Sequence, residues 1–332
     1  MIDVALVGYG WWGQHIAKRL IPESQFNLRY IVEPNESLHE DIQRTGAVPV
    51  LDYAQVLEDP RIDAVILTSP NDLHDLQIIQ AVAAKKHVFC EKPLSLSAEN
   101  ARKSVHLCRD AGLILGIGHE RRFETAHLML KDMLDAGALG TVMHTEMAFS
   151  HNKLIGLPPN SWRTSKAFAP AAGMTQMGIH LTDLLIAFYG PVASLHAFTA
   201  DRSLGWETGD VVTVQLKFKA GMTATLQAVL NTPHFIRTHV FGTDMWVEIR
   251  NATHPDTPGG EVTLQQYKSQ TDHEVRRLEW NDSVMANLDA FAAAVQGKAD
   301  YPYSDFELIH NIEVLDAIVS SAERGEAVHI DN

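Results

Sequence analysis

A glycine-rich segment near the start of the chain has the spacing of a dinucleotide-binding turn. It reads Gly8-Tyr9-Gly10-Trp11-Trp12-Gly13, follows the apolar run Ile2–Val7 and opens a helical pattern. In such a turn the first glycine permits the bend, the second lets the backbone approach a pyrophosphate, and the third allows close helix–strand packing. The N–H groups at the helix N-terminus attract phosphate. We therefore expect a bound dinucleotide; a glycine turn without a ligand is the alternative.

An acidic residue, Glu33, ends the next apolar run, 20 residues beyond Gly13. A carboxylate at this position can accept hydrogen bonds from the adenosine ribose hydroxyls and repels a 2′-phosphate. No arginine occurs in the ten residues that follow it. The sequence therefore predicts NAD in preference to NADP, with a solvated glutamate at a strand end as the alternative.

Two more polar segments follow strand-like runs, where a parallel sheet places its ligands. One is Ser69-Pro70-Asn71-Asp72-Leu73-His74, and the other is Glu91-Lys92-Pro93. Pro93 favours an extended conformation for the residue before it, which helps to direct Lys92. A lysine beside a nicotinamide can stabilise a forming alkoxide or relay its proton. Taken alone, Lys92 would be better explained as a surface residue in a turn.

The order of motifs along the whole chain is that of a known family. The chain resembles the glucose–fructose oxidoreductase / inositol dehydrogenase family, Gfo/Idh/MocA. The matching pieces are GYGWWG (8–13), SPNDLH (69–74), EKPLS (91–95), GHERRF (118–123), Leu139-Gly140, Trp162-Arg163, Gly173 through Gly178-Ile179-His180 to Asp183, and Phe218-Lys219-Ala220-Gly221.

This resemblance implies reversible oxidation of an alcohol carbon, usually on a sugar, a polyol or a related cyclic compound. It implies that Lys92 and His180 are catalytic, and that Trp162 and Arg163 lie near the nicotinamide. Asn71 and His74 would border the nicotinamide ribose. The residues expected at the cofactor are Gly8, Gly10, Trp11, Trp12, Gly13, Glu33, Ser69, Asn71, His74, Glu91, Lys92, Glu120, Trp162 and Arg163. Those expected at the substrate are Lys92, Arg163, Gln176 and His180.

One position departs from the family pattern, which has aspartate four residues before the histidine. Here that residue is Gln176. An amide can bond to a hydroxyl or an imidazole, but it cannot stabilise an imidazolium by charge. We therefore expect His180 to act with Lys92, with Gln176 touching the same substrate and with no carboxylate partner for the imidazole. A purely structural histidine, or a site that has lost its chemistry, are the alternatives.

The elements that must position these residues form two predicted domains. Over 1–121 short apolar runs alternate with helical patterns, which predicts an α/β Rossmann domain with a parallel sheet covered by helices on both faces. Over 122–332 long alternating strands dominate, ending with the meander 236–241, 245–249 and 262–267, followed by helices near 284–295 and 305–323. This predicts an α+β domain with a large, mostly antiparallel, open-faced sheet. We expect that face to join subunits into a dimer or tetramer.

Composition excludes several other classes of protein. Among 332 residues, 41 acidic against 27 basic side chains leave a formal net charge of −14, which is unfavourable for nucleic-acid binding. Two cysteines without CxxC spacing exclude a disulfide framework. The sequence has no HExxH motif and no cluster of His and Asp residues, so we expect no bound metal. No apolar stretch approaches the roughly 20 residues of a membrane span. We expect a cytoplasmic protein that binds neither nucleic acid nor membrane.

The cofactor motif together with the family resemblance implies an NAD(P)-dependent dehydrogenase or reductase acting on CH–OH groups of a sugar, polyol, lactol or related cyclic substrate. His180 would take the hydroxyl proton while Lys92 polarises the oxygen. Two alternatives stay open. One is an NAD-dependent glycosidase or isomerase that borrows and returns the hydride, and the other is a non-catalytic NAD-binding sensor or partner subunit.

Overall fold

A computed structural model of the protein describes residues 1–21, 24–158 and 160–330. It divides into two compact units. The first contains Met1–His119 and Met285–Ile312, and the second contains Glu120–Val284 and Glu313–Asn332. The sequence placed the division after residue 121, whereas the first compact segment ends at His119 and residues 285–312 also group with the first unit.

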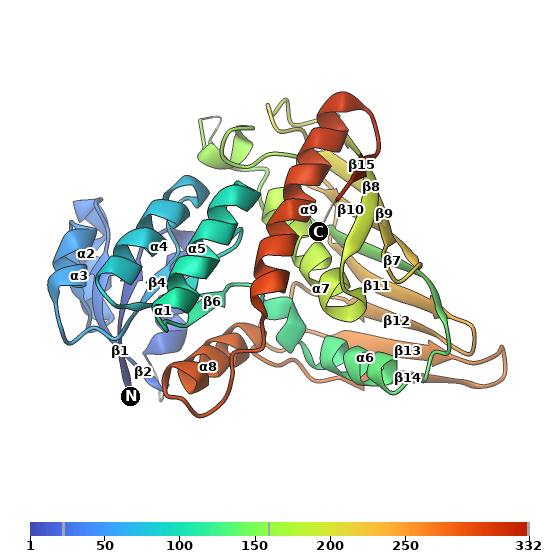
Figure 1. Ribbon diagram of the computed structural model, residues 1–332, viewed down its shortest axis with the longest axis horizontal. Helices are drawn as coiled ribbons and strands as arrows, with labels where there is room; N and C mark the ends of the chain where they lie inside the picture. Colours follow the sequence, from blue (N-terminus) through green and yellow to red (C-terminus); the bar gives the residue numbers. More distant parts are fainter. Residues whose placement is uncertain (22–23, 159, 331–332) are drawn as a thin grey trace. The chain divides into compact units, whose positions relative to one another are not determined.

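The first unit is built on a parallel sheet, shown with its helices in Figure 1. The strands of this sheet lie in the order β3-β2-β1-β4-β5-β6. All residues of β4 are buried, as is usual when helices cover both faces of a parallel sheet. Its strands are β1 (Ile2–Val7), β2 (Phe26–Val32), β3 (Val48–Val50), β4 (Ala64–Leu67), β5 (His87–Cys90) and β6 (Leu115–Ile117). Its helices are α1 (Trp11–Leu20), α2 (His39–Arg44), α3 (Tyr53–Glu58), α4 (His74–Ala83), α5 (Ala98–Asp110) and α8 (Ser283–Val295), with short η1 (Glu36–Leu38) and η2 (Asn71–Leu73).

Helix α8 belongs with this sheet because of its side chains. Phe291 is fully buried and meets the Phe89 ring of β5 edge-on, with centroids 5.5 Å apart. The Asn287 amide donates to the Ile117 carbonyl oxygen, and the Tyr301 hydroxyl bonds to the same oxygen and to the Asn287 side chain. Gly116 leaves room for both phenylalanine rings, since a Cβ there would lie 2.7 Å from Phe89 and 2.8 Å from Phe291.

The second unit contains a large sheet with the order β14-β13-β12-β11-β7-β10-β9-β8-β15. All neighbouring strands are antiparallel except β7 and β10, which are parallel. The strands are β7 (Val142–Ser150), β8 (Val192–Ala200), β9 (Val211–Phe218), β10 (Thr223–Val229), β11 (Phe235–Gly242), β12 (Trp246–Asn251), β13 (Val262–Tyr267), β14 (His273–Leu278) and β15 (Val328–His329). The mostly antiparallel sheet expected from the sequence is confirmed.

One face of this sheet is apolar and is covered by helices. In β9 the residues Val212, Val214, Leu216 and Phe218 are buried, while those between them are exposed or half-buried. Helix α6 packs on β12 and β13 through Ala126 and Leu130. The remaining helical segments are η3 (Glu120–Phe123), α6 (Thr125–Asp135), η4 (Trp162–Thr164), the π-helical turn η5 (Met174–Gly178), α7 (Ile179–Tyr189) and α9 (Asp305–Arg324), which continues from the first unit into the second.

Strand β14 was not expected from the sequence. Its residues His273–Leu278 include Glu274, Arg276 and Arg277 and are almost all exposed. It pairs with β13 at the edge of the sheet, where charged side chains are common because they discourage pairing with another chain. The alternation of apolar and polar residues that identifies other strands is therefore absent from this one.

Candidate functional site

The parallel sheet brings the predicted residues of the first unit to one edge. Gly8 follows β1, Glu33 follows β2, Ser69 lies two residues after β4, and Glu91 follows β5. These strands are neighbours in the order β2-β1-β4-β5. Because the strands are parallel, their carboxyl ends lie at the same edge, which is where open α/β sheets bind ligands.

The glycine turn has the geometry needed to approach a pyrophosphate. Gly8 has φ +95°, a conformation that favours glycine, and a Cβ on Gly13 would lie 2.2 Å from the Gly8 carbonyl oxygen. Around Gly10 the space that a Cβ would fill is open. Within the described residues no side chain caps the N-terminus of α1. Its N–H groups can therefore bind an anion, so the turn fits a dinucleotide.

The Glu33 carboxylate is held in a fixed orientation. One oxygen accepts from the backbone N–H of Tyr9 and the other from that of Asn35, both at 2.9 Å. It thus ties the end of β2 to the glycine turn while remaining an acceptor at this edge. The side chain is largely buried, so a solvated glutamate is not what this position contains.

His74 has a different environment from the one expected. The ring is fully buried, with Nδ1 2.8 Å from the Pro93 carbonyl oxygen and Nε2 3.1 Å from the Ser69 carbonyl oxygen. Both ring nitrogens thus face backbone carbonyls, and burial lowers the pKa of the imidazole. His74 links the loops that follow β4 and β5. Asn71 is also a buried member of these loops.

Glu91 is a buried carboxyl next to the predicted catalytic lysine. Burial raises its pKa to about 7, and the Trp12 indole and Lys92 only partly oppose this. Gly118 makes room for it, since a Cβ there would lie 2.4 Å from either carboxylate oxygen. Lys92 itself is half-buried, and its peptide bond to Pro93 is cis. Trp12, Glu91 and Lys92 therefore form one group at the end of β5.

The glutamine at position 176 anchors the loop that carries Trp162 and Arg163. Its amide Nε2 donates to the Arg163 carbonyl oxygen at 3.0 Å. The Arg163 guanidinium lies 4.1 Å from the centre of the Trp162 ring, and burial lowers its pKa. Gln176 lies in the π-helical turn η5, which leads directly into α7. An aspartate could not donate the bond to Arg163.

His180 has a carboxylate neighbour, contrary to the sequence-based expectation. It lies in the first turn of α7, and its Nδ1 is 3.7 Å from Oε2 of Glu120 in η3. Both side chains are mostly buried, with exposed fractions of 5% and 13%. The prediction of no carboxylate partner was wrong because it considered only the aspartate position four residues earlier. Glu120 comes from another element, 60 residues away in sequence.

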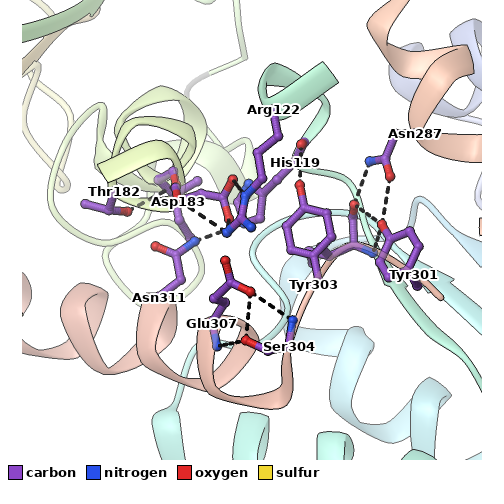
Figure 2. Close-up of polar contacts among 12 residues, drawn as sticks. His119, Arg122, Thr182, Asp183, Asn287, Tyr301, Tyr303, Ser304, Glu307 and Asn311 are labelled. Carbon is purple, nitrogen blue, oxygen red and sulfur yellow. Dashed lines mark hydrogen bonds and ion pairs between the residues drawn. The ribbon is translucent and has the colours of Figure 1, made fainter. Parts of the chain in front are cut away.

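Asp183, one turn after His180, has a structural role. Its carboxylate accepts two hydrogen bonds from the Arg122 guanidinium, at 2.8 Å from Nε and 2.7 Å from Nη2 (Figure 2). In the first unit, the same figure shows the Tyr303 hydroxyl donating to the His119 carbonyl oxygen. Asn311 also bonds to the His119 ring. Paired charges and bonded amides of this kind fix the backbone on either side of Glu120.

Sequence reasoning missed a group of histidines beside Phe149 in the second unit. The Phe149 ring lies 6.1 Å from His180, 5.7 Å from His151 and 5.5 Å from His254. Burial lowers the pKa of His151 to about 3, and His254 and Lys153 add to this effect. His254 pairs with Asp256 at 2.5 Å. Spacing along the sequence does not reveal this group, because His151 follows β7, His180 lies in α7 and His254 follows β12.

Two further properties concern the whole described part of the chain. Among the described residues, no group of three or more His, Cys, Asp or Glu side chains could hold a metal ion. In the same residues no helix is long and apolar enough to cross a membrane.

The raised pKa of Glu91 predicts how stability depends on pH. The folded state keeps the proton up to about pH 7, whereas an unfolded glutamate loses it near 4.5. The first unit should therefore lose stability as pH rises from 4.5 to 7, by on the order of 3 kcal/mol. Glu91→Gln should lack this loss, so its stability relative to wild type should increase between pH 5 and pH 8 in cofactor-free urea titrations. Glu99→Gln on the exposed side of α5 is the control, and an equal difference at both pH values would contradict the prediction.

Comparison with known proteins agrees with the fold and the motifs. Residues 2–119 match the model of the oxidoreductase family with an NAD-binding Rossmann fold, and residues 127–248 match the GFO/IDH/MocA C-terminal domain. The chain is 27% identical over 347 residues to scyllo-inositol 2-dehydrogenase (NAD(+)) of Bacillus subtilis, covering 99% of this chain and 96% of the relative. It is also 27% identical over 288 residues to 1,5-anhydro-D-fructose reductase of Ensifer adhaerens, covering 85% and 84%.

A solved structure shares the complete fold. A crystal structure of an oxidoreductase from Desulfitobacterium hafniense superposes with a TM-score of 0.90 at 23% identity, covering 99% of this chain and 97% of the other. Both halves of the predicted family pattern are thus matched, and the chain belongs to the GFO/IDH/MocA family of NAD-binding oxidoreductases.

Proposed function

We propose that this protein is an NAD-dependent oxidoreductase that transfers hydride between nicotinamide and an alcohol or carbonyl carbon of a sugar, polyol or related cyclic compound. The observation that carries the proposal is the arrangement at the carboxyl edge of the parallel sheet, where the glycine turn, Glu33 and Lys92 follow neighbouring strands. The family membership and the names of the two relatives support the same class of substrate.

In the proposed reaction Lys92 and His180 act on one substrate oxygen. When bound, NAD would supply the hydride acceptor for oxidation of the alcohol carbon, and NADH would supply the donor for the reverse reaction. Lys92 stabilises the negative charge that develops on the oxygen, and His180 takes the hydroxyl proton. Trp162 and Arg163 are proposed to line the nicotinamide end, with Gln176 holding their loop through the Arg163 carbonyl.

Lys92→Ala tests this mechanism directly. Removing the ammonium should lower kcat by about 10²- to 10⁴-fold, the usual contribution of an acid–base group, while leaving NAD binding intact. The assay follows NADH absorbance with a panel of polyols, aldoses and lactones, and NAD binding is followed by fluorescence. Lys103→Ala, on the exposed surface of α5, is the matched control. Full activity in Lys92→Ala would end the proposed mechanism.

The same assay separates the alternatives. A glycosidase or isomerase that returns the hydride would consume substrate with no net change in NADH, which product analysis would reveal. A sensor or partner subunit would bind NAD and turn over none of the panel. Net NADH formation from one of these substrates supports the dehydrogenase.

We further propose that Glu33 makes the protein prefer NAD to NADP. Its carboxylate is fixed by Tyr9 and Asn35 and would lie against a 2′-phosphate. Glu33→Gln keeps an acceptor for one amide and removes the charge, so discrimination by kcat/KM should fall by roughly tenfold, as expected for the loss of about 1.4 kcal/mol of repulsion. Glu36→Gln in η1 is the control. A lower KM for NADP than for NAD in the wild type would refute the preference.

We propose that the outer face of the large sheet binds a second copy of the chain. Rings from five strands form a row there, with Trp246 and Tyr267 stacked at 4.1 Å and Tyr267 and His273 at 4.5 Å; the row is completed by His144 and Phe241. The neighbouring Arg237 pairs with Glu146 and Glu248, so the face carries both signs of charge. Such a surface suits the self-complementary contact of a two-fold interface.

Sedimentation tests this assembly. The wild type should sediment as a dimer or tetramer at micromolar concentration, and Tyr267→Glu should shift it towards the monomer because a buried unpaired carboxylate is costly. Leu76→Glu, an exposed position on α4, is the control. A monomeric wild type would exclude the proposal.

We also propose that the protein is cytoplasmic. The thiols of Cys90 and Cys108 are free and buried, which agrees with a reducing compartment.

A further inference from the structure

A carboxylate beside His180 comes from a part of the chain that the family's catalytic pattern does not include. Glu120 Oε2 lies 3.7 Å from His180 Nδ1, and both side chains are largely removed from water. This distance is too long for a hydrogen bond with neutral imidazole but within the range of an ion pair. We propose that Glu120 is the positioning residue of His180, supplying the negative charge that the glutamine at position 176 cannot supply. The inference rests on the proposed function of His180.

The backbone around Glu120 is fixed from both sides. The next residue, Arg121, is only 1% exposed and pairs with Glu124 at 3.0 Å, and it also bonds to Asn251. The following residue, Arg122, holds Asp183 of α7 with two hydrogen bonds. Since Asp183 lies one turn after His180, the Arg122–Asp183 pair fastens η3 to the helix that carries the histidine. Glu120 is therefore placed at His180 by its immediate neighbours.

The other charges near α7 have partners of their own. The elements packed against it include η3, β7, η5 and, through Phe188, α6; η5 contains no charged residue, and His127 of α6 lies 3.5 Å from Glu124. In η3 the charge of Arg122 is matched by Asp183, and that of Arg121 by Glu124. In β7 Glu146 pairs with Arg237, while His144 contacts Thr223. Beyond Phe149, the lowered pKa of His151 leaves it neutral at pH 7, and His254 pairs with Asp256. Among these groups, Glu120 is the carboxylate that lies beside His180.

Gln176 has a different task from balancing the charge of the His180 imidazolium. Its amide donates to the Arg163 carbonyl oxygen, a bond that a carboxylate cannot make. In this chain residue 176 holds the Trp162–Arg163 loop, and Glu120 faces the imidazole. The two tasks of orienting the loop and balancing the imidazolium are divided between two side chains.

This arrangement has a defined place in the proposed oxidation. The O–H bond of the substrate breaks as His180 Nε2 takes the proton, and the C–H bond breaks as hydride passes to the bound NAD. The products are the carbonyl compound, NADH and an imidazolium, which later releases its proton to water. With Nδ1 towards Glu120, the carboxylate stabilises the imidazolium and favours the ring orientation in which Nε2 meets the hydroxyl. In this scheme Glu120 acts through His180, in place of the cofactor contact that the family resemblance implied for it.

The test compares Glu120→Gln with Glu120→Asp and wild type. Gln removes the charge at nearly constant size, so the acid limb of the kcat profile for alcohol oxidation should move to lower pH by about one unit, and the plateau should fall by roughly tenfold. KM for NAD should stay unchanged. Asp keeps the charge but is one carbon shorter, so the pH profile of Glu120→Asp should lie between those of wild type and Glu120→Gln. Glu99→Gln on α5 is the control for loss of a distant charge.

A second measurement does not depend on turnover. The titration of the His180 ring, followed by NMR of ¹⁵N-histidine-labelled protein and assigned with His180→Gln, should move to lower pH in Glu120→Gln by the same amount. If Glu120→Gln does not fold, the smaller shift in Glu120→Asp serves the same purpose. A ring titration and an acid limb that both stay at their wild-type positions would overturn the inference. A wild type that forms no NADH would instead refute the proposed function, while the ring titration would still report on the Glu120–His180 pair.

Discussion

The parallel alignment of the first sheet is the constraint on which the arrangement of the site depends. Hydrogen bonding between parallel strands forces their carboxyl ends to one edge. Residues 8, 33, 69 and 91 are far apart in sequence and lie near one another only because each follows such a strand. The side chains then link the loops: Glu33 binds Tyr9, and His74 joins Ser69 to Pro93. The sheet positions the loops of the site, and buried polar contacts hold these loops in shape.

Buried ionisable groups are stabilised differently in the two units. Arg121, Arg122, Glu124 and Asp183 are all largely buried, and each is paired with an opposite charge, as a low-dielectric interior requires. Glu91 has no equally strong pairing, and burial instead raises its pKa to about 7. The second unit thus holds its charges by mutual pairing around α7. In the first unit, a carboxyl at the ligand edge prefers to keep its proton.

Local features of the chain were sufficient to predict much of the fold. The alternation of apolar runs and helical patterns predicted the parallel sheet, and period-two patterns predicted strands such as β9. The glycine spacing predicted the turn after β1, and the motif order predicted the family. Strand β14 was missed because its exposed, charged sequence has no apolar periodicity. The environment of His74 was also missed, since burial and its two carbonyl contacts depend on loops that come together only in the folded chain.

The Glu120–His180 contact shows the same limit at the site. The sequence identifies His180 and the replacement at position 176, because both lie within one local motif. It does not reveal a partner 60 residues earlier, whose placement requires the Arg122–Asp183 pair and the packing of η3 on α7. Spacing along a helix relates residues a few positions apart, whereas contacts between elements depend on the tertiary fold.

The chain leaves the first unit at His119 and returns to it at Met285. Phe291 then covers the ring of Phe89, and Asn287 and Tyr301 bond to the carbonyl at the end of β6. During synthesis, the parallel sheet therefore emerges long before the helix that completes its core. Until that helix arrives, Phe89 and the end of β6 lack these contacts. The core of the first unit is therefore built from two segments that are distant in the sequence. A gene fragment that encodes only the Rossmann strands omits part of this hydrophobic core.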